Sequence, residues 1–149
     1  MSEKSAAPKL VVSNPEDGTA KSIQLDPRVF QLFIGKKIGD EIDGSILGFK
    51  GYKIKITGGT DRDGFPMRPE VSGPRKVKLL ISGGAGFHPR EKPASKKKKK
   101  RLRRIKKGLR KRRTVRGNVV SEAITQINAV LVAYQTESKK KEVAEAEAS

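Results

Sequence analysis

The stretch from Lys96 to Arg116 contains fifteen Lys or Arg residues and no Asp or Glu. Such a stretch cannot fold on itself, because neighbouring positive charges repel one another until counter-ions arrive. The phosphate backbone of nucleic acid is the densest counter-ion available to a protein. The stretch therefore predicts a basic arm outside any core that binds a polyanion. Nuclear import and attachment to anionic membranes are alternative uses of such a run.

The charge of the chain is strongly segregated. Residues 1–74 hold eleven Lys or Arg against ten Asp or Glu, and residues 117–149 hold three against five. Residues 75–116 hold twenty against one, so they carry almost all of the net charge of +18. A near-neutral body with one basic arm is the electrostatic footprint of a nucleic-acid-binding protein rather than charge spread for solubility.

Length and composition limit what the rest of the chain can be. A chain of 149 residues predicts one domain with appendages, and its hydrophobic share of 34% predicts a modest core. The absence of cysteine excludes disulfides and thiolate metal sites, and it fits a reducing compartment. No apolar stretch approaches the roughly 18 residues that a membrane helix needs, and residues 1–9 lack a hydrophobic signal core. These features predict a cytoplasmic protein without a membrane partner.

Short strand patterns dominate the body. An Asn-Pro-Glu-Asp-Gly turn separates apolar residues 9–13 from alternating residues 21–25, which predicts a β-hairpin. Strands are also predicted at Tyr52–Thr57, Lys76–Ser82 and Thr114–Val120. Residues 119–134 fit either a helix or a strand by periodicity alone. The pattern predicts a mainly-β, small barrel-like domain with a long basic loop and a short charged tail.

One short helix is predicted after the hairpin. Asp26 is placed to cap it and Pro27 to occupy its first position. The apolar residues expected to point inward are Val29, Phe30, Phe33 and Ile34. The predicted organisation is a flexible N-terminus at 1–8, a body at 9–90, the arm at 91–114, returning strands at 115–135 and a tail at 136–149.

The most distinctive string is GGTDRDGFPM at residues 58–67. It lacks the Lys-Ser or Lys-Thr of a phosphate-binding loop and the later ligands of a calcium loop. A wide turn fits it better, with glycines at positive φ, Asp61 and Asp63 closing Asx-type turns, and Phe65 filling the core. The predicted structural turn residues are Gly58, Gly59, Asp61, Gly64, Phe65 and Pro66.

The sequence offers no catalytic or metal site. His88 is the single histidine, so it cannot build a metal centre in a chain without cysteine, and no nucleophile partner for it is evident. A nucleic-acid contact and a plain exposed position both remain open for it. The chain is therefore predicted to be no enzyme and to need no cofactor, metal or small-molecule substrate.

Three strings taken together resemble a known family. They are Tyr52-x-Ile-x-Ile-x-Gly-Gly-x-Asp-x-x-Gly-Phe-Pro-Met67, then Lys76-Val-x-Leu-Leu-x-Ser82, then Arg112-Arg-Thr-Val-Arg-Gly117. In content and order they are similar to the small-ribosomal-subunit protein six of archaea and eukaryotes, over roughly residues 9–134. The resemblance implies a β-barrel-like body, no enzyme activity and a structural role on the RNA of the small subunit, among neighbouring ribosomal proteins. It also favours strand for 118–134.

The chain departs from the family pattern at its end. Eukaryotic members carry a long basic C-terminal helix with regulatory serines, whereas this tail is short and acidic, so that regulation is not carried over. The form is archaeal-like. The side chains predicted to bind RNA are Arg75, Lys76, Lys78, His88, Arg90, Lys96, Lys97, Lys98, Lys99, Lys100, Arg101, Arg103, Arg104, Lys106, Lys107, Arg110, Lys111, Arg112, Arg113 and Arg116.

The rival hypothesis is a non-ribosomal nucleic-acid-binding or chromatin-type basic protein with the same charge. The position of the arm argues against it, because the arm lies between two predicted strands and not at a terminus. A loop of this kind suits insertion between RNA helices better than coating a duplex. An RNA-modifying enzyme would need a cofactor loop, a metal cluster or paired carboxylates, and none is evident.

Overall fold

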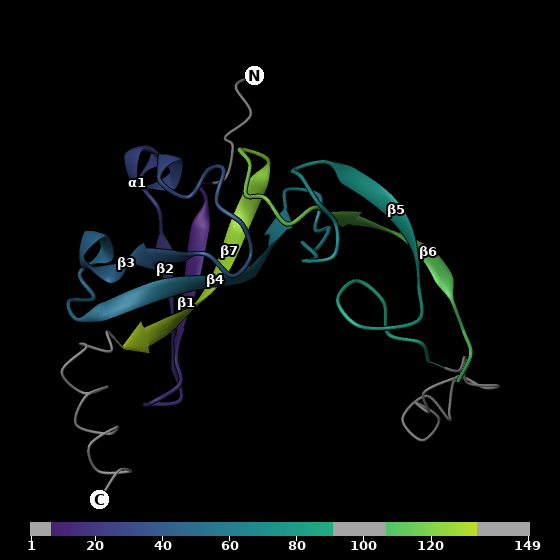
Figure 1. Cartoon of the computed structure of the whole chain (residues 1–149), viewed down its shortest axis with the longest axis horizontal. Helices are drawn as coiled ribbons and strands as arrows, with labels where there is room; N and C mark the ends of the chain where they lie inside the picture. Colours follow the sequence, from purple (N-terminus) through teal and green to yellow (C-terminus); the bar gives the residue numbers. More distant parts are fainter. Residues whose placement is uncertain (1–6, 91–106, 134–149) are drawn as a thin grey trace, which may run out of the picture.

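The computed structural model describes residues 7–90 and 107–133. Their strands form a five-stranded sheet in the order β2-β1-β7-β4-β3, here called the body sheet, and a separate two-stranded unit of β5 and β6, here called the ribbon (Figure 1). The strands are β1 (Lys9–Asn14), β2 (Thr19–Gln24), β3 (Glu41–Asp43), β4 (Tyr52–Asp61), β5 (Lys76–Ile81), β6 (Lys111–Arg116) and β7 (Ile124–Ala133). The mainly-β prediction is confirmed. In the described residues the body sheet is open, with β2 and β3 at its edges, so a closed barrel is not found.

The predicted hairpin is confirmed, and it supplies one flank of the body sheet. β1 and β2 pair antiparallel around the Pro15–Gly18 turn, with Leu10 opposite Ile23. β1 also pairs parallel with β7, where Leu10 lies opposite Ile127. Alternation along β1 buries Leu10 and Val12, because residues two apart lie on the same face of a strand.

The short helix is present as α1 (Pro27–Gln31), with Pro27 in its first turn. The expected cap is only partly right, because Asp26 occupies the N-cap position but its side chain makes no capping hydrogen bond. Phe30 and Phe33 are buried as predicted. Ile34 is not, since the helix ends before it and leaves its side chain 36% exposed. A single 3-10 turn, η1 (Gly44–Leu47), follows β3.

The long antiparallel pair of β4 and β7 is the centre of the body. Ile54 lies opposite Leu131 and Ile56 opposite Ala129, and all four are buried. Residues 124–133 are therefore strand, and the helical alternative for this part of the chain is wrong. The core cluster comprises Leu10, Val12, Leu25, Phe30, Phe33, Ile54, Ile56, Met67, Val120, Ile124, Ile127, Ala129 and Leu131.

The GGTDRDGFPM string begins as strand and not as a turn. β4 continues through Gly58 and Gly59 to Asp61, with register shifts after Ile56 and after Thr60. Gly59 is required by close packing and not by positive φ, because a Cβ there would lie 2.5 Å from the carbonyl oxygen of Gln126. The turn proper covers residues 62–64 and uses Gly64 at φ +82°.

Two further expectations for this string are corrected. Phe65 is only half-buried, and Met67, 4% exposed, is the residue that enters the core. The Asp61 and Asp63 carboxylates do not close Asx-type turns but accept hydrogen bonds from cationic side chains on the ribbon.

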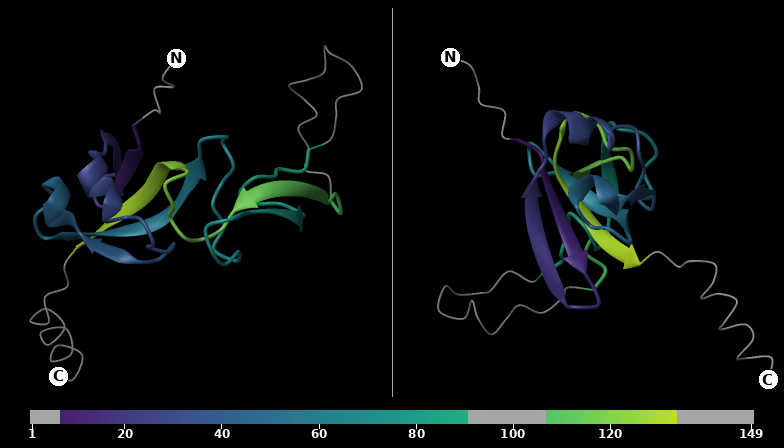
Figure 2. Two further views of the ribbon diagram at one scale, coloured as in Figure 1. Left: turned by 90° about the horizontal axis from the view of Figure 1, so that it is seen from above. Right: turned by 90° about the vertical axis from the view of Figure 1, so that its left-hand side faces the viewer.

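The ribbon extends away from the body sheet, as the views in Figures 1 and 2 both show. β6 begins three residues before the predicted strand and ends at Arg116. It ends there because the following residues bond to the loop before β5: the Gly117 N–H donates to the Arg75 carbonyl (3.1 Å) and the Asn118 N–H to the Val71 carbonyl (2.8 Å). The division into body, arm and tail stays a prediction, and residues 91–106 and 134–149 lie outside the described residues.

Candidate nucleic-acid interface

The two faces of the ribbon differ in character. In an antiparallel pair, directly opposite residues share a face. One face carries the pairs Val77–Val115, Leu79–Arg113 and Ile81–Lys111. Val115 and Ile81 are buried there, and the loop after β5 passes over Val115, since a Cβ on Gly86 would lie 3.6 Å from its Cγ1. This loop also carries the buried Phe87, whose ring centroid is 5.5 Å from the Arg113 guanidinium carbon, a cation–π contact.

The other face, here called the outward face, carries the pairs Lys76–Arg116, Lys78–Thr114 and Leu80–Arg112. Lys78, Leu80 and Arg112 are exposed. Leu80 is 60% exposed, more than Leu32 at 48% or Ile46 at 47%. This face therefore presents two cations and an apolar side chain at the end of the ribbon farthest from the body.

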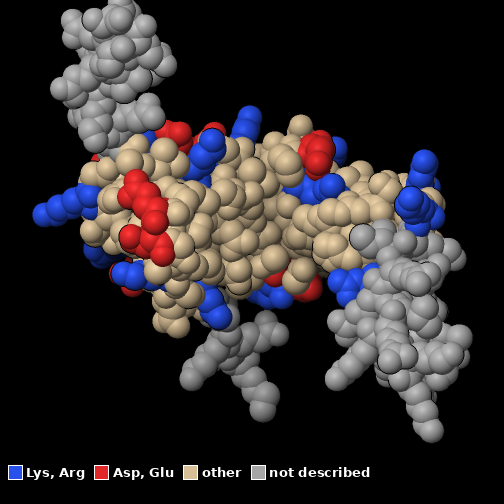
Figure 3. Space-filling model, turned by 90° about the horizontal axis from the view of Figure 1, so that it is seen from below, with Lys and Arg blue, Asp and Glu red and all other residues tan. Residues whose placement is uncertain are grey.

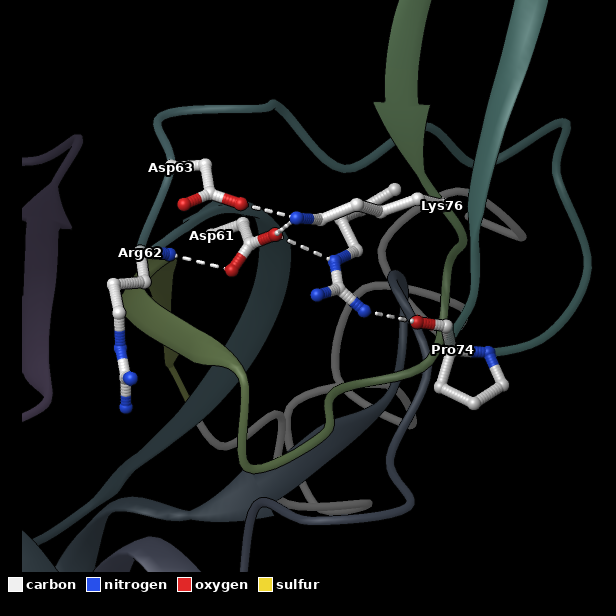
Figure 4. A network of polar contacts seen from close by, with 6 residues as sticks. Asp61, Arg62, Asp63, Pro74 and Lys76 are labelled. Atoms are coloured by element: carbon white, nitrogen blue, oxygen red, sulfur yellow. Dashed lines mark hydrogen bonds and ion pairs between the residues drawn. The ribbon is translucent and has the colours of Figure 1, made fainter.

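At the other end of the ribbon, Asp61 holds both strands to the body sheet (Figure 4). Its carboxylate, 2% exposed, accepts a hydrogen bond from Arg116 Nε at 2.8 Å and lies 3.3 Å from Lys76 Nζ. Arg116 Nη1 also donates to the Pro74 carbonyl at 2.8 Å, and Lys76 bonds to the more exposed Asp63. Since Lys76 and Arg116 are a cross-strand pair, one carboxylate at the end of β4 fixes both strands of the ribbon.

The charges of this junction stabilise one another. Burial alone would raise the pKa of Asp61, but the hydrogen bonds from Arg116 and Lys76 outweigh it and hold the pKa of that carboxyl below its ordinary value. The hydrogen bond to Asp63 raises the pKa of Lys76 against a smaller opposing effect of desolvation. The Asp61 carboxylate and the Lys76 ammonium group are therefore both ionised at neutral pH.

The cations beyond the junction, on the ribbon and its adjoining loops, differ from Lys76 and Arg116 in their exposure and their partners. All are exposed, and none has an acidic partner within residues 7–90 and 107–133. They are Arg75, Lys78, Arg90, Lys107, Arg110, Lys111, Arg112 and Arg113. Figure 3 shows Lys and Arg side chains at the right-hand end of the molecule and others spread over the rest of this face, with a group of acidic side chains at the left.

The predicted site residues therefore fall into four groups. Lys76 and Arg116 are paired with acids at the junction, and the exposed cations just named lie along the ribbon and its adjoining loops. His88 is exposed in the loop after β5. The remaining candidates, which are Lys96, Lys97, Lys98, Lys99, Lys100, Arg101, Arg103, Arg104 and Lys106, lie outside the described residues.

Sequence reasoning missed two features of this region. The first is the position of Leu80. Residues two apart on a strand share a face, so Leu80 had to lie on the same face as Lys76 and Lys78. The pairing of Asp61 with ribbon cations was also missed, because nothing local in the sequence brings residue 61 to residue 116. In the described part of the chain, no cluster of three or more metal-binding side chains occurs, and no helix is long and apolar enough to cross a membrane.

Comparison with known protein sequences identifies relatives of this chain. Residues 8–107 and 101–145 match the family described as ribosomal protein S6e. The small ribosomal subunit protein eS6 of Methanoculleus marisnigri is 43% identical over 92% of this chain and 89% of its own length. The eS6 protein of Archaeoglobus fulgidus is 45% identical over 85% and 87% of the two chains, and that of Methanothermobacter thermautotrophicus is 44% identical over 83% and 85%. A chain that shares nearly half of its residues with these proteins along most of its length belongs to the ribosomal protein S6e family.

Proposed function

We propose that this chain is a structural component of the small ribosomal subunit in the archaeal cytoplasm and that it binds ribosomal RNA through the ribbon and the basic arm. Membership in the S6e family supports the ribosomal role and the expectation that the chain is not an enzyme. Its partners would be the RNA of the small subunit and neighbouring ribosomal proteins.

The observation that carries the RNA contact is the contrast among the cations of the ribbon. Lys76 and Arg116 are neutralised by acids at the junction, whereas eight exposed cations beyond it lack acidic partners in the described residues. Residues 91–106, which connect the loop after β5 to the stretch before β6, add ten further Lys or Arg. Because phosphates supply the missing negative charge, this end of the molecule is the surface that binds RNA.

The arm also has a fixed origin on the ribbon. Residues 91–106, which hold most of its charge, lie in sequence between β5 and β6, and these two strands pair with each other. The Asp61 junction anchors that ribbon, which lowers the entropy lost when the arm docks. A chromatin-type tail would have no such anchor, and no observation favours that rival.

The test is the salt dependence of binding to small-subunit ribosomal RNA. Each neutralised phosphate contributes about −0.7 to −0.9 to the slope of log K against log salt. Deleting residues 96–107, which removes ten cations, is expected to flatten that slope by several units and to lower incorporation into small subunits in competition with the tagged wild-type chain. An unchanged slope with a native circular dichroism spectrum would place the RNA surface elsewhere.

A further inference from the structure

We propose that the outward face of the ribbon docks in the minor groove of an RNA helix, with Leu80 packed against ribose and with Lys78 and Arg112 bound to the flanking phosphates. This inference rests on the proposed function and names the surface and the RNA feature that meet. It gives Leu80 an apolar contact with ribose, which electrostatic attraction between cations and phosphates would not explain.

The exposure of Leu80 is the first argument. Its side chain is 60% exposed beside the exposed Lys78 and Arg112, whereas Val77, Leu79 and Ile81 on the other face are half-buried or buried. Burying an exposed leucine against an apolar surface is favourable, because it removes apolar area from water. A ligand that offers only phosphates would leave that side chain without a contact.

The neighbours of Leu80 indicate what kind of surface it meets. Arg112 lies directly opposite Leu80 across the ribbon, and Lys78 is two residues away on the same strand and the same face. Neighbouring strands lie about 4.8 Å apart and residues two apart along a strand about 6.6 Å apart, so one ligand contacts all three side chains. The ligand must therefore combine anionic and apolar parts at close spacing, and an RNA backbone of phosphates and riboses does so.

The shape of the ribbon selects the groove. The minor groove of A-form RNA is wide and shallow and exposes riboses, whereas the major groove is too deep and narrow for side chains to read. A two-stranded ribbon presents the side chains of both strands on one broad face, which fits a wide, shallow groove. The Asp61 junction fixes its base through Arg116 at 2.8 Å, so the outward face is presented without a large ordering cost.

The experiment compares Leu80→Ala with Leu32→Ala. Leu32 is a matched control, because it is 48% exposed but lies beside α1 on the body. With small-subunit ribosomal RNA, Leu80→Ala is expected to weaken binding about tenfold, the equivalent of roughly 1.4 kcal/mol, and to leave the salt slope unchanged, because no phosphate contact is removed. Arg112→Gln is expected to reduce the magnitude of the slope by about 0.7–0.9. Leu32→Ala is expected to match the wild type.

Hydroxyl-radical footprinting adds a structural readout, because these radicals cleave riboses. The wild-type chain and Leu32→Ala are expected to protect a short run of riboses across a helix, and Leu80→Ala is expected to lose that protection. Wild-type affinity and footprint for Leu80→Ala would overturn the inference while leaving the proposed function intact, since deletion of 96–107 would still flatten the slope. Normal RNA binding with poor incorporation into subunits would also overturn it, because Leu80 would then contact a ribosomal protein.

Discussion

The body sheet and the ribbon are both built from antiparallel strands, but different forces hold them in place. The body sheet encloses a continuous apolar cluster in which Leu10, Ile54, Ile56 and Ile127 have no exposed surface. The ribbon buries only Ile81, Val115 and the nearby Phe87, and all three lie outside that cluster. Apolar burial thus explains the body, whereas the ribbon depends on its junction with the body.

We expect that difference to separate stability from RNA binding along the molecule. The apolar core supplies most of the free energy of folding. Eight exposed cations without acidic partners in the described residues gather on the ribbon and its adjoining loops, where they repel one another in the free protein. The Asp61 junction joins the two regions, because β4 of the body sheet ends on the carboxylate that binds Lys76 and Arg116. The comparison predicts that substitutions in each region will affect different measurements.

The largest expected effect is a loss of stability in the body. Ile54→Ala removes a fully buried side chain from the central strand, and we expect the free energy of unfolding to fall by about 2–5 kcal/mol in urea titrations. Ile46→Ala, at a position 47% exposed, should change it by no more than about 0.5 kcal/mol. If Ile54→Ala folded as stably as Ile46→Ala, the core would not be where the structure places it.

The next effect tests how closely Gly117, which follows β6, packs against the loop before β5. A Cβ on Gly117 would lie 1.7 Å from the carbonyl oxygen of Gly73, so Gly117→Ala must displace the loop before β5. We expect a loss of about 1–3 kcal/mol by thermal or chemical denaturation, as for other overpacked sites. Gly58→Ala is the matched control, since a Cβ there meets nothing within 4 Å. Equal stabilities of the two variants would contradict this packing.

A smaller effect is expected when the junction loses its charge. Asp61→Asn keeps the shape but removes the charged acceptor of Arg116 and Lys76, so we expect a loss of roughly 1.5–3 kcal/mol at neutral pH, the range for hydrogen bonds to charged groups. Asp63→Asn, with a side chain 53% exposed, should cost no more than about 1 kcal/mol. Similar losses for the two variants would show that Asp61 is not the central group of the junction.

The pH dependence of the same variant sharpens that test. Because the pKa of Asp61 is lowered in the folded chain, its contribution to stability is fully present above its unfolded pKa, about 3.9. That contribution is lost as the pH falls through the lower folded value. The stability difference between wild type and Asp61→Asn should therefore be constant from neutral pH to about pH 4 and shrink below it. A difference that vanished already near pH 6 would contradict the assigned pKa shift.

The sequence predicted the elements of the body because their signals are local. Alternation in residues 52–57 and the Asn-Pro-Glu-Asp-Gly turn mark a strand and a hairpin wherever they occur. The order of strands in the sheet was not predictable in the same way. The parallel pairing of β1 with β7 joins residues more than a hundred positions apart, and no local pattern specifies it.

In the GGTDRDGFPM string, too, the structure depends on residues that are distant in sequence. Glycine pairs usually mark turns, but Gly59 is needed because the Gln126 backbone approaches it from another strand. Phe65 was expected in the core because it is apolar, yet Lys76 Nζ lies 5.1 Å from its ring centroid at the junction. For the proposed binding region, charge density in the sequence indicates a location, whereas the division into cations with and without acidic partners depends on tertiary contacts.

The central claim is that RNA binds the ribbon end and not the body sheet. The direct test compares two triple variants that remove the same charge: Lys78, Lys111 and Arg112 changed to Gln on the ribbon, and Lys9, Lys21 and Lys55 changed to Gln on the body sheet. All six side chains are exposed. The measurement is the salt slope of binding to small-subunit ribosomal RNA. The ribbon triple should reduce the slope by about 2 units and the body triple by almost nothing. Equal reductions by the two variants would contradict the claim.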